Sequence, residues 1–140
     1  MSLHQTMSLH QTMLEQKGIS DPAASVVILR VRLWPALQIA ADDRTPALVA
    51  FEGDALEELL HCTSLRFDFT DGTRSAAIEA VQCHKAWLEL PEPVALTKEK
   101  DAKLVLTFKK TYRTPFAEGF VDMRISVDGY VVLPSGAEVN

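Results

Sequence analysis

The sequence predicts a mainly β protein, an antiparallel β-barrel or sandwich of about seven or more strands with one short helix packed on or capping it. Several segments alternate apolar and polar residues with the period of a half-buried strand. Two Asp-Gly pairs, at 71–72 and 128–129, each stand between such segments and are typical of two-residue hairpin turns. Strands do not alternate with long helical segments, which disfavours a parallel α/β sheet.

The central prediction is a hairpin over residues 64–90 with Asp71-Gly72 at its tip. A type I′ turn fits this dipeptide because both central residues need positive φ. We expect the return strand to continue to Leu90 and to end at Pro91, because proline cannot donate to a ladder. The turn sets a register that pairs Thr70 with Thr73, Phe69 with Arg74, Asp68 with Ser75, Phe67 with Ala76, and Leu65 with Ile78.

A strong strand is predicted over Ser25–Trp34, ended by Pro35. Strict alternation places four apolar residues on one face, namely Val27, Leu29, Val31 and Leu33. The other face begins apolar and turns polar at Arg30. Weaker strands are expected over residues 36–41 and 47–51.

Two further strands follow near the C-terminus. Residues 102–113 are expected to lie centrally in a sheet, since Leu104 to Phe108 is apolar on both faces. Residues 121–127 alternate cleanly, with the odd-numbered side chains inside. The second Asp-Gly pair then predicts a hairpin that sets Val127 opposite Tyr130 and Ile125 opposite Val132.

The clearest helix signal lies at residues 55–62. Asp54 suits the N-cap and Glu57 completes the capping-box spacing. Its buried stripe is expected to be Leu56, Leu59 and Leu60. A second short helix is predicted over residues 7–17, ended by Gly18.

The predicted organisation is a tail or short helix over residues 1–20, one β-rich domain over 21–134, and a polar C-terminal tail over 135–140. The chain opens with the tandem repeat MSLHQT-MSLHQT. We interpret one copy as a duplicated start; the alternative is a binding tail that uses His4 and His10, but two histidines so spaced make a poor metal site.

Composition narrows the function classes. The net charge of -5 argues against a dedicated nucleic-acid binder. Two cysteines suggest a reducing compartment, and no apolar run is long enough to span a membrane. A cytoplasmic location is the expectation, since the N-terminus has no signal-peptide pattern. The basic segment Lys98–Arg113 favours a lysine-protected strand edge over an RNA-binding strand.

Four potential zinc ligands occur as the mirrored pairs His61-Cys62 and Cys83-His84. Neighbours on a helix point about 100° apart and neighbours on a strand point to opposite faces, so each pair can offer one ligand to a common point. No metal site is therefore predicted, and no cofactor. A Cys–His nucleophilic dyad using Cys62 or Cys83 lacks any surrounding signature, and phosphate loops and nucleophile elbows are missing from the sequence.

The leading hypothesis is a non-enzymatic intracellular binding module that self-associates, most simply as a homodimer. It rests on one face of the return strand, where Val81, Lys85, Trp87 and Glu89 are expected to form an interface with tryptophan as the anchor. Burial of Trp87 under another element is the competing interpretation. The alternative function is a small-ligand binder or enzyme that uses the barrel interior, with Arg74 and His84 as polar contacts.

Overall fold

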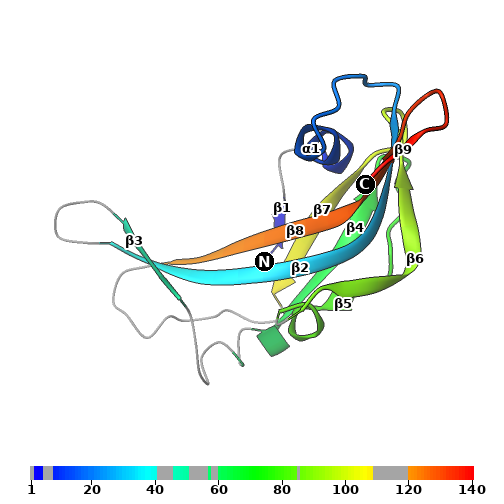
Figure 1. Ribbon diagram of the computed structural model, residues 1–140. Coiled ribbons are helices and arrows are strands. Elements are labelled where there is room, and N and C mark those ends of the chain that lie inside the picture. The colour runs from blue at the N-terminus through cyan, green and yellow to red at the C-terminus, as the bar shows by residue number, and fades with distance from the viewer. Residues whose placement is uncertain are drawn as a thin grey trace.

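The computed structural model describes the backbone of residues 2–4, 8–40, 46–50, 57, 60–84, 86–108 and 120–140. Within these ranges the chain forms two antiparallel sheets and the helix α1 (Leu9–Gln16) (Figure 1). The prediction of a mainly β fold with antiparallel sheets is confirmed, and so is the short N-terminal helix before Gly18.

The first sheet has the strand order β1–β7–β4–β5, and the second has the order β3–β2–β8–β9, with β6 pairing with β2. The strands of the first sheet are β1 (Ser2–His4), β7 (Ala102–Phe108), β4 (Thr63–Phe69) and β5 (Ile78–Glu79). Those of the second sheet are β3 (Pro46–Ala50), β2 (Ser25–Ala40), β8 (Phe120–Val132), β9 (Glu138–Val139) and β6 (Leu88–Leu96). A 3₁₀ helix, η1 (Ala80–Gln82), follows β5.

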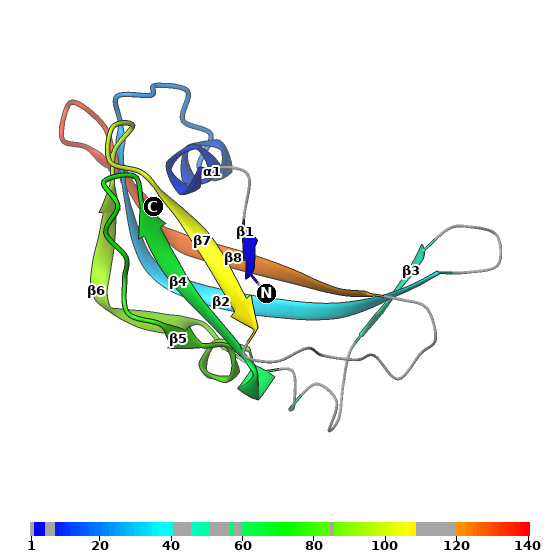
Figure 2. The ribbon, with the colours of Figure 1, turned by 180° about the vertical axis from the view of Figure 1, so that it is seen from behind.

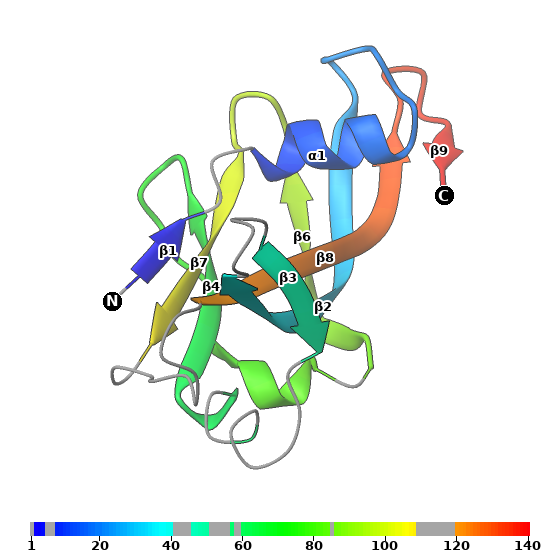
Figure 3. The same cartoon turned by 90° about the vertical axis from the view of Figure 1, so that its left-hand side faces the viewer.

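The described core lies between the sheets and under α1. Figure 2 shows β4 and β7 facing the long strands β2 and β8, and Figure 3 shows α1 lying across one end of this arrangement. Leu9, Met13 and Leu14 of α1 are buried in the same cluster as residues of both sheets. This burial stabilises a helix that is too short to persist alone.

A β-bulge at Leu29 reverses the faces of β2. Ile28 pairs with Gly129 and Arg30 pairs with Asp128, so β2 carries one residue more than β8 at this point. The core face therefore passes from Val26 and Ile28 to Val31 and Leu33, all fully buried. The predicted single face with strict alternation was wrong for Val27 and Leu29, because the alternation does not continue through the bulge.

Pro35 lies inside β2 and does not end it. The Leu33 amide donates to the carbonyl of Cys83 at 2.9 Å, on the edge of β2 that faces away from β8. The backbone nitrogen of residue 35, two positions later, faces the same edge. On that side the pairing of β2 with β6 ends at Val31 and the pairing with β3 starts at Ala36. The missing proline N–H thus breaks no ladder bond, so the predicted stop was wrong.

Asp128-Gly129 forms no turn, and the predicted second hairpin was wrong. β8 runs straight through these residues, with Gly129 opposite Ile28. The chain reverses later, where the Leu133 amide donates to Ala137 at 2.8 Å and Gly136 has φ of 93°. This three-residue loop leads into β9.

The hairpin at Asp71-Gly72 exists, with a different turn. The Phe69 amide donates to the Thr73 carbonyl and the Gly72 amide to Phe69, which makes a three-residue loop. Asp68 bridges to Arg74 and not to Ser75 as predicted, whereas the predicted pair Leu65–Ile78 is confirmed. Between these two pairs the returning segment has one residue more than β4, which brings the pairing back to the predicted register at Leu65 and Ile78.

The return strand leaves the first sheet after Glu79. It passes through η1 and enters β6, which pairs with β2 in the second sheet. Pro91 and Pro93 lie within β6, where Ile28 pairs with Val94 and Arg30 with Glu89, so the prolines occupy a segment without paired residues. The predictions of one continuous strand and of a stop at Pro91 were wrong.

Other predictions fall partly outside the described residues. Glu57, Leu60 and His61 have helical backbone and Leu60 is buried, whereas Asp54, Leu56 and Leu59 are not described. β7 confirms the predicted central strand up to Phe108, with Leu104, Val105 and Leu106 all buried. Its continuation from residue 109 to Arg113 lies outside the described residues.

Candidate interaction surface

Trp87 is a large apolar side chain that is exposed, with 39% of its surface accessible. It directly precedes β6, in which Leu88 pairs with Val31 and Glu89 with Arg30. Leu88 packs against the core, so the alternation of a strand turns Trp87 and Glu89 outward. An indole is thereby held on the outer face of the second sheet.

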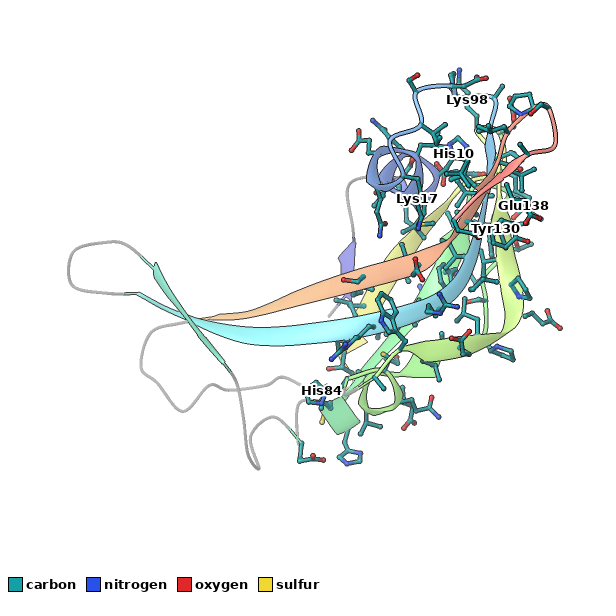
Figure 4. The ribbon with its side chains drawn as sticks, in the orientation of Figure 1. His10, Lys17, His84, Lys98, Tyr130 and Glu138 are labelled. Atoms are coloured by element: carbon teal, nitrogen blue, oxygen red, sulfur yellow. The ribbon has the colours of Figure 1, made fainter. Side chains whose placement is uncertain are left out.

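Charged groups of both signs lie on the same face. The Arg30 guanidinium donates from Nε to Glu89 Oε1 at 2.8 Å and from Nη1 to an oxygen of Asp128. Lys17 directly follows α1 (Figure 4), and its Nζ lies 3.4 Å from Asp128 Oδ1. We call Trp87, Glu89, Arg30 and Asp128 the Trp87 surface.

The ion pairs on this surface shift two pKa values. Partial burial by itself raises the pKa of Asp128, but hydrogen bonds from Arg30, the Gly129 amide and Lys17 outweigh it, and the pKa lies below its ordinary value. Hydrogen bonds to Glu89 and Asp128 raise the pKa of Arg30. Both partners therefore stay charged near neutral pH.

The remaining predicted interface residues lie elsewhere. Val81 belongs to η1 and packs, partly buried, against the core. Cys83, on the same predicted face, is fully buried. Lys85 lies outside the described residues. The structure thus leaves Trp87 and Glu89 as the predicted residues that share this surface.

Burial raises the pKa of the Cys83 thiol to about 11. A thiol at this pKa is almost entirely protonated near neutral pH, which disfavours a nucleophilic role. His61 is exposed and lies 3.7 Å from Glu57, one helical turn away. Across the described residues, no three His, Cys, Asp or Glu side chains are grouped as metal ligands would be.

Arg74 and His84 lie at opposite ends of β4. Arg74 bridges to Asp68 near the C-terminal end, and its exposed side chain lies 4.0 Å from that carboxylate. His84 follows η1, which itself follows β5. β5 pairs with Ser64 and Leu65, near the N-terminal end of β4. The two residues therefore do not share a ligand site in this structure.

A cavity of about 410 Å³ lies beside α1 and is not lined by His84. Lys98 and Asp101 line it together with residues of α1 and of the segment that follows it. His10 points from α1 toward this region (Figure 4) and is buried. Its Nε2 lies 2.7 Å from the Ala24 carbonyl oxygen, and the Asp101 carboxylate accepts from the His10 amide at 3.0 Å. The sequence analysis did not predict this contact; the helical spacing of Leu9, Met13 and Leu14 is a signal that this side of α1 packs against the core.

Comparisons with protein-family models, curated proteins and solved structures give no match for this chain. Among the described residues, no helix has both the length and the apolar character that crossing a bilayer requires.

Proposed function

We propose that this protein is a non-enzymatic intracellular binding module that self-associates as a homodimer through the Trp87 surface. The exposure of Trp87, directly before β6, is the observation that supports the proposal most directly. Tryptophan is enriched among residues that dominate interface energetics, because one side chain buries a large apolar area.

The charges around Trp87 favour a second copy as the partner. A two-fold axis brings the same patch against itself, so a charged patch is self-complementary when it carries both signs of charge. The Trp87 surface offers the cation of Arg30 beside the carboxylates of Glu89 and Asp128. Glu89 keeps 68% of its side chain accessible, so it can also contact a guanidinium of the partner copy. Such exposed pairs give orientation more than affinity.

Sedimentation velocity over a concentration series tests the proposal. We expect the wild type to shift from monomer to dimer, and Trp87→Ala to weaken the association constant about thirtyfold or more, since truncation of an interface anchor costs about 2 kcal/mol or more. Trp87→Phe is the matched control, because it keeps most of the apolar area. It should associate more strongly than the alanine variant.

Urea unfolding of Trp87→Ala separates assembly from folding. The core side of the strand is unchanged, so the unfolding free energy of the monomer should change little. A wild type that stays monomeric at high micromolar concentration would contradict the proposal. A dimer that Trp87→Ala leaves intact would also contradict it.

A further inference from the structure

The two copies of the N-terminal repeat adopt different structures. Ser2-Leu3-His4 forms β1, whereas the identical Ser8-Leu9-His10 forms the N-cap and first residues of α1. The second copy is fixed by burial of Leu9 and His10 and by the Ser8 side chain, which accepts from the Gln11 amide at 2.9 Å. Only the first copy is therefore free to leave its place without breaking the described core.

β1 covers an edge of the first sheet that is prone to pair. It lies antiparallel to β7, with Ser2 opposite Thr107, Leu3 opposite Leu106 and His4 opposite Val105. β7 is apolar on both faces, with Leu104, Val105 and Leu106 buried. Such an edge is a template for another strand unless it is covered.

The hydrogen-bond pattern identifies the backbone groups that hold β1. The Thr70 amide donates to the Asp101 carbonyl at 3.0 Å, so the backbone N–H and C=O groups of residue 101 face β4. In an antiparallel ladder, the backbone groups of successive residues face opposite neighbouring strands. The N–H and C=O groups of Val105 and Thr107 therefore also face β4, and those of Leu106 face β1. Among the described residues of β1, this pattern assigns the backbone hydrogen bonds to β7 to the reciprocal pair of Leu3 and Leu106.

We infer that the β7 edge around Leu106 is a strand-acceptor site, and that the N-terminal strand of a second copy can replace β1 there. The exchanged strand has the same sequence, so it makes the same backbone bonds in trans as in cis, and strand exchange of this kind costs little. Residues 5–7 link β1 to Ser8 and span at most about 14 Å. Exchange therefore requires the neighbouring α1 to lie close to this edge.

This site is separate from the Trp87 surface, which belongs to β6 and the second sheet. Deletion of residues 1–6 tests it, because the shortened chain keeps Ser8, α1 and every described core residue. In the ¹⁵N-labelled shortened protein we expect hydrogen exchange of the Leu106 amide to accelerate at least about tenfold. The Val105 and Thr107 amides serve as internal controls, since β4 still protects them.

Addition of unlabelled peptide MSLHQTM, standing for the strand of a second copy, should slow exchange at Leu106 again in a dose-dependent manner. A peptide with Leu3→Pro should not, because it lacks the donor that faces Leu106, whereas a Ser2→Pro peptide should, because residue 2 points away from β7. The full-length Leu3→Pro protein provides a second test of edge opening that needs no deletion.

Two results would overturn the inference. One is a Leu106 amide that exchanges equally in the full-length and shortened chains. The other is a shortened chain whose Leu106 amide gains no protection from millimolar peptide or from unlabelled full-length protein. Neither result depends on Trp87, and loss of the dimer in Trp87→Ala leaves this test unaffected.

Discussion

Gly129 of β8 lies so close to Val27 of β2 that a Cβ atom on Gly129 would be 1.8 Å from the Val27 carbonyl oxygen. No side chain can be accommodated at that distance unless the backbone of one strand moves. The close approach coincides with the bulge at Leu29, where β2 carries its extra residue. Glycine is therefore needed here for space and not for a turn.

Gly129→Ala should destabilise the protein by about 2 kcal/mol or more, because the contact is with backbone and cannot relax through a side-chain rotation. Urea unfolding followed by circular dichroism measures this loss. Gly72→Asn is the control: its φ of 88° is one that asparagine tolerates, and a Cβ there meets nothing within 4 Å. If both variants were equally stable, the close approach would be refuted.

The same glycine shows why the sequence predicted some elements and not others. Strand positions were predictable because alternation and apolar content are local, as in β4, β7 and the first part of β2. Asp128-Gly129 and Asp71-Gly72 carry the same local signal, yet one crosses a bulge and the other closes a hairpin. The choice depends on the partner strand, which no local pattern specifies.

The candidate surface was predictable to a similar extent. Trp87 was expected on an outward face, and the structure places it there because Leu88 fills the inward position. Its charged neighbour Glu89 was also expected. Arg30, which pairs with both Glu89 and Asp128, comes from β2, and Asp128 comes from β8. Val81 could not be placed correctly, because the 3₁₀ turn η1 ends the alternation on which the prediction relied.

Met13→Ala tests whether α1 is part of the fold. The side chain is fully buried in the core cluster, so truncation should lower the unfolding free energy by about 2–5 kcal/mol. Gln11→Ala is the matched control, since residue 11 is exposed on the same helix. Equal stability of the two variants in urea unfolding would show that α1 is not docked.

The carboxylate of Asp128 predicts a defined acid sensitivity. An aspartate whose pKa is lowered by folding stabilises the folded state above its unfolded pKa, and this contribution is lost as the pH falls through the folded pKa. The loss should therefore occur below about pH 3.8, the ordinary value of the group. In Asp128→Asn, unfolding free energies measured between pH 5 and pH 2.5 should decline less steeply. An unchanged slope would mean that Arg30 does not pair with this carboxylate.

The two thiols should react at different rates. Cys83 is fully buried with a pKa of about 11, whereas Cys62 is partly exposed. In Cys62→Ser, which leaves Cys83 alone, a thiol reagent at pH 8 should react slowly until urea unfolds the chain. Cys83→Ser should keep a thiol that reacts in the folded protein. Fast native reaction of Cys83 would contradict its placement in the core.

Fluorescence of Trp87 tests self-association most directly. The chain has two tryptophans, so Trp34→Phe leaves Trp87 as the sole indole reporter. Acrylamide quenching should be strong at low micromolar concentration, where 39% of Trp87 is accessible, and should weaken severalfold at high micromolar concentration as the dimer covers it. Equally strong quenching across the whole concentration range would contradict self-association through Trp87.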